Sequence, residues 1–98
     1  LLAEYFESRE ALKAVIVFMD IRHPLKQIDL EMIELCERSE VPYVPVLTKS
    51  DKVSKNILMK TIQQVSKATN AREVLAISSQ KGVGFEKLRK VLLGYAND

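Results

Sequence analysis

The stretch Y-V-P-V-L-T-K-S-D, Tyr43 to Asp51, begins as an apolar run and ends abruptly in four polar residues. The run predicts a buried strand at residues 43–48, and the polar residues from Thr48 to Asp51 predict a loop at its carboxyl end. In open α/β sheets, loops at this position present the ligand contacts. Because Pro45 can donate no ladder hydrogen bond, we expect the strand to be irregular or weakly paired at its start.

Two further strands are predicted, one on each side of this stretch. Residues 14–20, A-V-I-V-F-M-D, form an apolar run rich in β-branched side chains, which is typical of a strand buried on both faces. Residues 73–77 predict a third strand, and the polar loop S-S-Q-K-G-V-G follows at 78–84. Apolar residues at helical spacing predict four helices, at residues 1–12, 28–39, 54–68 (with Ser54 as N-cap) and 85–95.

The order of these elements determines the expected fold. Strands that alternate with helices pair in parallel through right-handed crossovers. We therefore expect an α/β fold with three layers, αβα, in which a three-stranded parallel sheet has helices on both faces. The carboxyl ends of the strands then point the same way, and they carry Asp20 and the loops 48–51 and 78–81.

Composition limits the classes of function. The chain has 98 residues, enough for one domain, and its net charge of +2 is too small to argue for nucleic acid by itself. A lone cysteine, Cys36, cannot form an internal disulfide, which fits a reducing compartment, and we expect a cytoplasmic protein. The longest apolar run, residues 14–19, is far short of the ~20 residues that span a bilayer, so no membrane is expected as a partner.

The polar loops suit one ligand, the guanine base. Guanine carries two donors, N1–H and the 2-amino group, which a carboxylate such as that of Asp51 can accept as a bidentate pair. Adenine lacks both donors there, and the unpaired carboxylate would cost about 1–3 kcal/mol or more. The Lys49 stem can lie flat on the base with its ammonium in water. The loop 78–81 offers backbone N–H groups to guanine O6.

These motifs resemble those of a known family. T-K-S-D at 48–51 resembles the N/T-K-x-D element of Ras-like GTPases, and I-S-S-Q-K-G at 77–82 resembles their S-A-x-K element. The segment E-Y-F-E-S-R-E-A-L-K-A-V-I-V-F-M-D-I-R-H-P-L, Glu4 to Leu25, is very similar to the corresponding part of the EngB (YihA/YsxC) family of bacterial GTPases. The resemblance runs over nearly all of the chain.

The resemblance implies roles for three residues of the first loop. Asp51 would pair with guanine N1 and N2, and Lys49 would pack its stem on the base. Thr48 would brace the loop, at a position where many relatives have asparagine.

Three residues of the second loop also receive roles from the resemblance. Ser78 would support the loop, and Ser79 would give its backbone N–H to O6 where many GTPases have alanine. Because that contact comes from the backbone, the serine should cost little. Lys81 would flank the base.

Two elements of such GTPases are missing from these 98 residues, the phosphate-binding loop G-x-x-x-x-G-K-[S/T] and the D-x-x-G loop near Mg²⁺. The chain also begins with Leu1-Leu2 rather than methionine. We therefore expect residues 1–98 to be one partial domain, the carboxyl-terminal half of a P-loop (Ras-like) GTPase domain. It would bind GTP or GDP through the base and contain no catalytic residue.

The resemblance further implies what the intact parent does. It would bind GTP with Mg²⁺ and hydrolyse it as a switch in assembly of the large ribosomal subunit or its precursor, linked to normal cell division and septum formation. The 98 residues alone should not hydrolyse GTP, since the ligands of Mg²⁺ and of the phosphates would lie outside them.

Two alternatives remain open at this point. A phospho-receiver module also places an aspartate, a hydroxyl residue and a lysine after successive strands, as Asp20, Thr48 and Lys81 do, but it needs an acidic pair after its first strand. The other alternative is an interaction surface without a nucleotide. In the Ras-like fold, strand 14–20 would normally have a neighbour from the missing half, so we expect its edge to be exposed and apolar here and self-association to occur through it.

Overall fold

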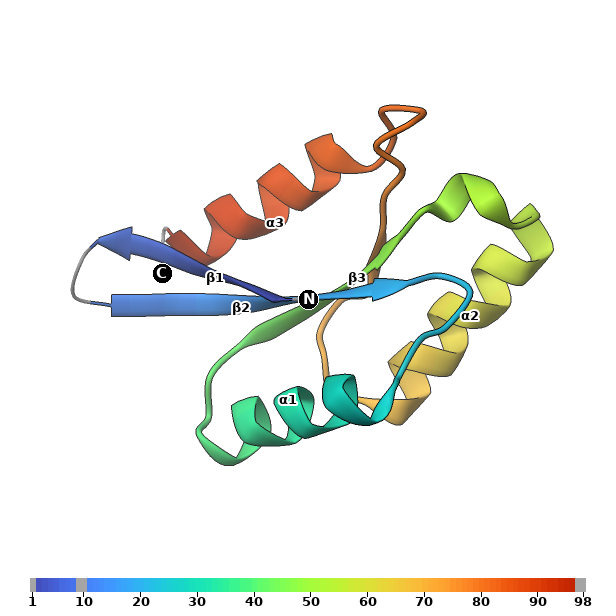
Figure 1. Cartoon of the computed structure of the whole chain (residues 1–98). Coiled ribbons are helices and arrows are strands. Elements are labelled where there is room, and N and C mark those ends of the chain that lie inside the picture. Colours follow the sequence, from blue (N-terminus) through green and yellow to red (C-terminus); the bar gives the residue numbers. More distant parts are fainter. Residues whose placement is uncertain (1, 9–10, 97–98) are drawn as a thin grey trace.

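The chain folds into a mixed β-sheet flanked by helices in the computed structural model, which describes the backbone of residues 2–8 and 11–96 and the side chains of residues 14–95 (Figure 1). Along the chain the elements are β1 (Leu2–Ser8), β2 (Ala11–Asp20), α1 (Gln27–Arg38), β3 (Tyr43–Thr48), the 3₁₀ turn η1 (Ser50–Lys52), α2 (Lys55–Ala68), β4 (Leu75–Ala76) and α3 (Phe85–Ala96).

The sheet has the strand order β1-β2-β3-β4, and its last three strands are parallel. Asp20 at the end of β2 is the register partner of Thr48 at the end of β3, and Leu47 is the partner of Ala76 in β4. The carboxyl ends of the three strands therefore lie in one row. This confirms the predicted α/β fold with a parallel three-stranded core.

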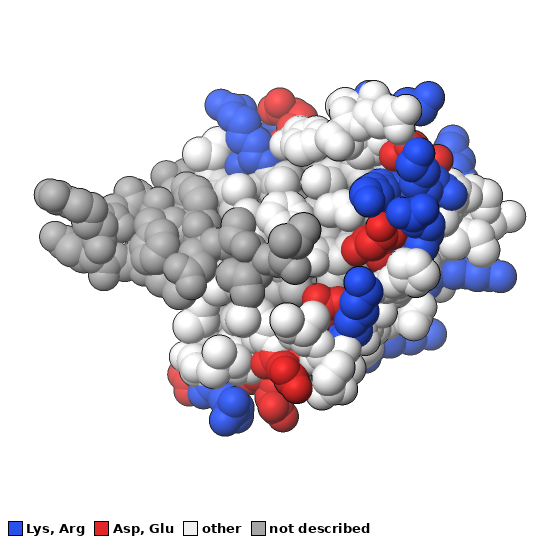
Figure 2. Space-filling view, viewed as in Figure 1, with Lys and Arg blue, Asp and Glu red and all other residues white. Residues whose placement is uncertain are grey.

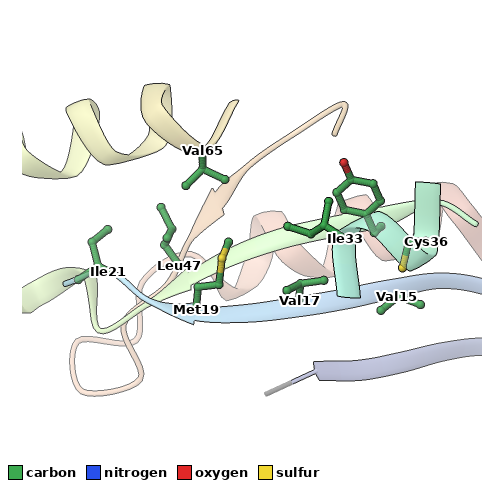
Figure 3. Close-up of a cluster of buried hydrophobic side chains, with 9 residues drawn as sticks. Val15, Val17, Met19, Ile21, Ile33, Cys36, Leu47 and Val65 are labelled. Carbon is green, nitrogen blue, oxygen red and sulfur yellow. The ribbon is translucent and has the colours of Figure 1, made fainter. Parts of the chain in front are cut away.

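Helices cover both faces of the sheet (Figure 1). Successive side chains of a strand point to opposite faces, and because the strands are apolar on both, each face buries its side chains under a helix. On one face Val17 and Met19 of β2 pack with α1 and with Val65 of α2 (Figure 3). On the other face Ile16 of β2 and Val46 of β3 pack in a cluster with α3. The three predicted layers are present.

Local sequence signals explain where two helices begin. The Ser54 hydroxyl accepts a hydrogen bond from the Ile57 backbone N–H (3.3 Å), which confirms the predicted N-cap of α2. At α1 the Asp29 carboxylate accepts from the Lys26 backbone N–H at 3.0 Å, so an acidic side chain satisfies a free donor of the first turn. Within the described residues, no helix has both the length and the apolar composition needed to cross a membrane.

The helix predicted at residues 1–12 is wrong. Residues 2–8 form β1, which pairs antiparallel with β2 from Leu2 opposite Val17 to Ser8 opposite Ala11; residues 1, 9 and 10 lie outside the described part. An edge strand leaves a row of backbone donors and acceptors unpaired, and an adjacent segment that pairs with it satisfies them. Tertiary pairing here overrides the helical spacing of the apolar residues.

The open edge predicted for strand 14–20 is also wrong over most of its length. β1 covers β2 from residue 11 to residue 17, so this edge is already paired within the chain. The expectation of self-association through strand 14–20 required that edge to be free, and it therefore loses its basis.

Pro45 affects the sheet on one side only. Opposite β2, strand β3 keeps a continuous register from Tyr43 to Thr48, so the irregularity expected at its start is absent on that side. Opposite β4, pairing begins at Val46, directly after the proline, and β4 is shorter than the strand predicted at 73–77. Pro45, which has no backbone N–H to donate, thus lies just before the first residue of β3 that pairs with β4.

A tight loop connects β4 to α3. Ser78 and Val83 exchange two backbone hydrogen bonds, of 3.0 and 3.1 Å, which closes the loop across its base. Gly84 follows with φ +91°, and a Cβ placed on it would meet the Ala76 carbonyl oxygen at 2.2 Å. Only glycine allows this close approach of the loop to β4.

We expect Gly84→Ala to lower the free energy of unfolding by about 2–4 kcal/mol, because a positive φ and a backbone clash act together. Gly82→Ala is the matched control, since Gly82 also has a positive φ (+68°) but open space around it, and should cost about 1 kcal/mol. Urea unfolding of both variants checks this. Equal losses would contradict the close approach at Gly84.

Candidate nucleotide-base site

The two polar loops predicted to read a base lie next to each other. The Ser50 backbone N–H donates to the Ile77 carbonyl at 3.0 Å, and the Ile77 N–H donates to the Leu47 carbonyl at 2.8 Å. These bonds join the end of β3 to the segment that follows β4. The loop after β3 and the loop after β4 therefore lie side by side at the carboxyl end of the sheet (Figure 1).

Asp51 and Ser78 form the direct side-chain link between these loops. The Ser78 hydroxyl donates to Asp51 Oδ1 at 2.6 Å. Ser78 is 1% exposed and the Asp51 side chain 11%, so the hydroxyl is buried while the carboxylate still reaches the surface. The hydrogen bond from Ser78 is the main cause that lowers the pKa of the Asp51 carboxyl. Asp51 is therefore ionised at neutral pH, with lone pairs left for further donors.

The loop after β4 is organised by the same hydroxyl. Ser78 Oγ accepts from the Lys81 backbone N–H at 3.1 Å, so its oxygen both donates and accepts. Ser79 lies at the exposed start of the turn. Within the part of the chain whose side chains are described, no group accepts a hydrogen bond from the Ser79 backbone N–H. This donor lies one residue after the Ser78 hydroxyl that holds Asp51.

Thr48 and Lys49 face the neighbouring strand β2. The Thr48 hydroxyl donates to the Met19 carbonyl at 3.4 Å, a long contact that ties the loop to β2. Lys49 has a left-handed backbone, φ +60° and ψ 40°, and its Nζ lies 3.6 Å from Asp20 Oδ2. The Lys49 side chain is 57% exposed, so its stem runs over the surface between the ends of β3 and β2.

The structure thus brings the six predicted residues to one end of the sheet in two groups. Asp51, Ser78 and the Lys81 backbone are bonded to one another, whereas Thr48 and Lys49 contact β2. Ser79 lies beside the first group on the turn. Their contact with a base remains a prediction.

Sequence reasoning missed three participants, Lys52, Asp20 and Arg22. Lys52 Nζ lies 3.8 Å from Asp51 Oδ2. Asp20, which the sequence placed at a strand end, accepts from the Arg22 backbone N–H at 2.8 Å and forms ion pairs with Arg22 and Lys49. The position of Asp20 at the end of β2, next to the end of β3, was the feature of the sequence that could have indicated this role.

Basic side chains gather where these loops lie. Figure 2 shows Lys and Arg on the right of the molecule, the side on which β2 and β3 end in Figure 1, with acidic side chains among them. Arg22 is 44% exposed and Lys52 46% exposed. The site therefore combines a positive rim with the recessed carboxylate of Asp51, an arrangement suited to an anionic ligand that also presents hydrogen-bond donors.

Two larger grooves lie elsewhere, at the amino ends of the strands. Two open grooves of about 810 and 660 Å³ share Arg72 and Tyr95 in their walls. In the smaller one the Tyr43 hydroxyl already donates to Glu37 and accepts from the Asn70 backbone N–H. Charges of both signs line the larger one. We place the candidate site at the carboxyl ends because the predicted residues come together there, although these two grooves are large.

Comparison with known proteins assigns the family. A family model described as "Elongation factor Tu GTP binding domain" matches residues 2–98. The chain belongs to this family of GTP-binding domains. The match confirms the P-loop GTPase fold class predicted from the sequence, of which this chain forms a part.

The chain is also similar to curated proteins named "Probable GTP-binding protein EngB". It is 42% identical over 95 residues to the protein of Tolumonas auensis, covering 93% of this chain and 45% of the relative. It is 43% identical over 95 residues to the proteins of Shewanella sp. strain ANA-3 and Shewanella piezotolerans, covering 93% of this chain and 43% and 42% of those relatives. The predicted resemblance to EngB is confirmed, and the chain spans less than half the length of these relatives.

We expect Ser78→Ala to raise the pKa of the Asp51 carboxyl toward its ordinary value near 4, because the Ser78 hydroxyl is the main cause of its lowering. A lowered folded-state pKa gives stability that is present above the unfolded pKa and is lost as the pH falls through the folded pKa. The variant should therefore lose stability at neutral pH and show a smaller further loss on acidification. Carbon-detected NMR titration of the Asp51 carboxyl measures the pKa directly.

Ser79→Ala is the control for this prediction, because the Ser79 side chain takes no part in the Asp51 contacts. The Asp51 pKa should stay at its wild-type value in this variant. An unchanged Asp51 pKa in Ser78→Ala would contradict the role of the hydroxyl.

Proposed function

We propose that this chain is the guanine-reading part of a GTPase domain and binds GTP and GDP through the base. The observation that carries the proposal is the Asp51 carboxylate, which the buried Ser78 hydroxyl holds at 2.6 Å beside the loop after β4. Membership of a GTP-binding family and similarity to proteins named for GTP binding support it.

Hydrogen-bond chemistry explains why this carboxylate selects guanine. Ser78 occupies one lone pair of Asp51 Oδ1, and the remaining lone pairs of both oxygens are available to N1–H and the 2-amino group. Adenine offers an acceptor at N1 and no amino group at C2. A recessed carboxylate facing that edge would be desolvated without compensation, which costs about 1–3 kcal/mol or more.

The other predicted residues support the same base. The Ser79 N–H is proposed to donate to O6, and the exposed Lys49 stem to cover one face of the ring. Thr48 braces its loop against β2, and Lys81 flanks the base from the turn that Ser78 supports. Base reading then needs residues of this chain only.

The assignment of Mg²⁺ rests on sequence motifs. Because the phosphate-binding loop and the D-x-x-G loop do not occur in these 98 residues, we assign Mg²⁺, the phosphates and hydrolysis to the intact parent. The parent is proposed to be a cytoplasmic GTPase that acts in assembly of the large ribosomal subunit and in cell division and septum formation.

The receiver alternative is disfavoured by the surroundings of Asp20. A phosphoacceptor aspartate has to be accessible, whereas both oxygens of Asp20 accept from Arg22, and its second cation is Lys49 rather than Lys81. The family match over residues 2–98 points in the same direction.

An amide NMR titration of this chain with GDP, and with ADP as control, tests the proposal. Shifts limited to residues 48–52 and 78–83, with GDP only, are expected because the base contacts all lie there. Affinity should be weak, since the contacts to the phosphates are not included. A well-dispersed spectrum that responds to neither nucleotide would favour the interaction-surface alternative.

Asp51→Asn should transfer the preference from guanine to xanthine nucleotides. Xanthine has an oxygen in place of the 2-amino group, so an amide that donates to O2 and accepts from N1–H matches it, whereas guanine leaves the amide N–H₂ facing another donor. We expect at least a tenfold inversion of the ratio of GDP to XDP affinity, about 1.4 kcal/mol. The same NMR titration measures the affinities for GDP and for XDP. An equal loss of affinity for the two nucleotides would argue against direct pairing of the base with Asp51.

A further inference from the structure

Asp20 is fixed at the end of β2, opposite Thr48 of β3. Its Oδ1 accepts from the Arg22 backbone N–H (2.8 Å) and from Arg22 Nε (3.1 Å), and its Oδ2 accepts from Arg22 Nη2 (2.9 Å). A carboxylate with three such bonds has one orientation, which is the geometry of a bidentate arginine pair. Asp20 is thus a fixed negative charge at the strand end.

Lys49 is fixed at its other end, the backbone. Its carbonyl accepts from the Lys52 N–H at 2.9 Å, and the Ser50 N–H that follows it is bound to Ile77 at 3.0 Å. The Lys49 backbone itself is left-handed, with φ +60° and ψ 40°. Nζ then lies 3.6 Å from Asp20 Oδ2. The lysine stem therefore spans two anchored points, one on each of two neighbouring strands.

This arrangement has a consequence for ligand binding. A lysine side chain has more rotamer freedom to lose than most, and a ligand that has to order it loses affinity. A stem whose ammonium pairs with Asp20 has given up part of that freedom before the ligand arrives. The residual exposure of 57% leaves its apolar surface available for contact.

We infer that Asp20 is a positioning residue for the base site, holding Lys49 by its ammonium so that the stem is in place before the base binds. This inference rests on the proposed function, since it assigns the Lys49 stem to a base. The stem contacts the flat face of a ring, which all bases share, whereas Asp51 reads the edge. Asp20 therefore contributes to affinity and not to the choice between guanine and adenine.

The test uses Asp20→Asn, which keeps the shape and removes the charge. The dissociation constant for GDP should rise about threefold to tenfold, the usual effect of releasing one ordered long side chain. ADP should still cause no shift. The thermal midpoint should fall by less than about 4 °C, because the pair is on the surface. Glu34→Gln is the matched control, since it makes the same charge change on an exposed position of α1.

A double-mutant cycle with Lys49→Met separates positioning from a general effect on the loop. Methionine keeps an apolar stem and loses the ammonium, so it should weaken GDP binding as much as Asp20→Asn does. The double variant should show no further loss, because both changes remove one interaction. NMR relaxation of the side chain at position 49 in the nucleotide-free chain should show greater mobility in Asp20→Asn than in the wild type and Glu34→Gln.

Four results would overturn the inference. If the wild type binds GDP and Asp20→Asn binds it with the same affinity, the role of Asp20 is wrong and the proposed function still stands. Additive losses in the double variant, or unchanged mobility at position 49, would mean that Asp20 acts through Arg22 and the turn after β2. A wild-type chain that does not respond to GDP would overturn the proposed function, and this role with it.

Discussion

The parallel register of β2, β3 and β4 is the constraint on which the rest of the structure depends. It places Asp20 beside Thr48 and the segment after Ala76 beside Leu47, so that three loops distant in sequence emerge in one row. Parallel strands require crossover helices, and α1 and α2 both pack on the same face of the sheet as a result. A change of register by one residue would exchange the two faces and separate the loops.

Burial of one hydroxyl determines the orientation of the carboxylate at this edge. Ser78 is 1% exposed, and a buried hydroxyl has to be hydrogen-bonded. The Ser78 hydroxyl donates to Asp51 and accepts from the Lys81 N–H, so it acts as a donor and as an acceptor at once. A rotation of the hydroxyl away from Asp51 would leave a buried polar group without its partner. The packing of the loop against β4, which requires Gly84, therefore also sets the direction of the Asp51 side chain.

Sequence patterns predicted what depends on local chemistry. The strand at 43–48, the cap at Ser54 and the convergence of Asp51 and Ser78 all follow from residue type, alternation and order along the chain. The strand at Leu2–Ser8 was not predicted from the sequence. Its pairing with β2 is a tertiary interaction, and the same residues carry a helical pattern that competes with it. The ion pair between Asp20 and Lys49 was also missed. The predicted row of strand ends placed both residues at one edge, but no sequence motif assigned Asp20 a partner there.

Base recognition and phosphate binding make different demands on a chain. Reading a base edge requires a few groups held in fixed directions. Each group that we propose to read the base is oriented by a contact within residues 20–83: Asp51 by Ser78, Lys49 by Asp20, the turn by Val83. Holding a triphosphate requires a phosphate-binding loop, and the pattern G-x-x-x-x-G-K-[S/T] does not occur in these 98 residues. The proposed contacts would therefore give selectivity for the base with low affinity, because the orientation of a few groups sets the selectivity and the number of charged contacts sets the affinity.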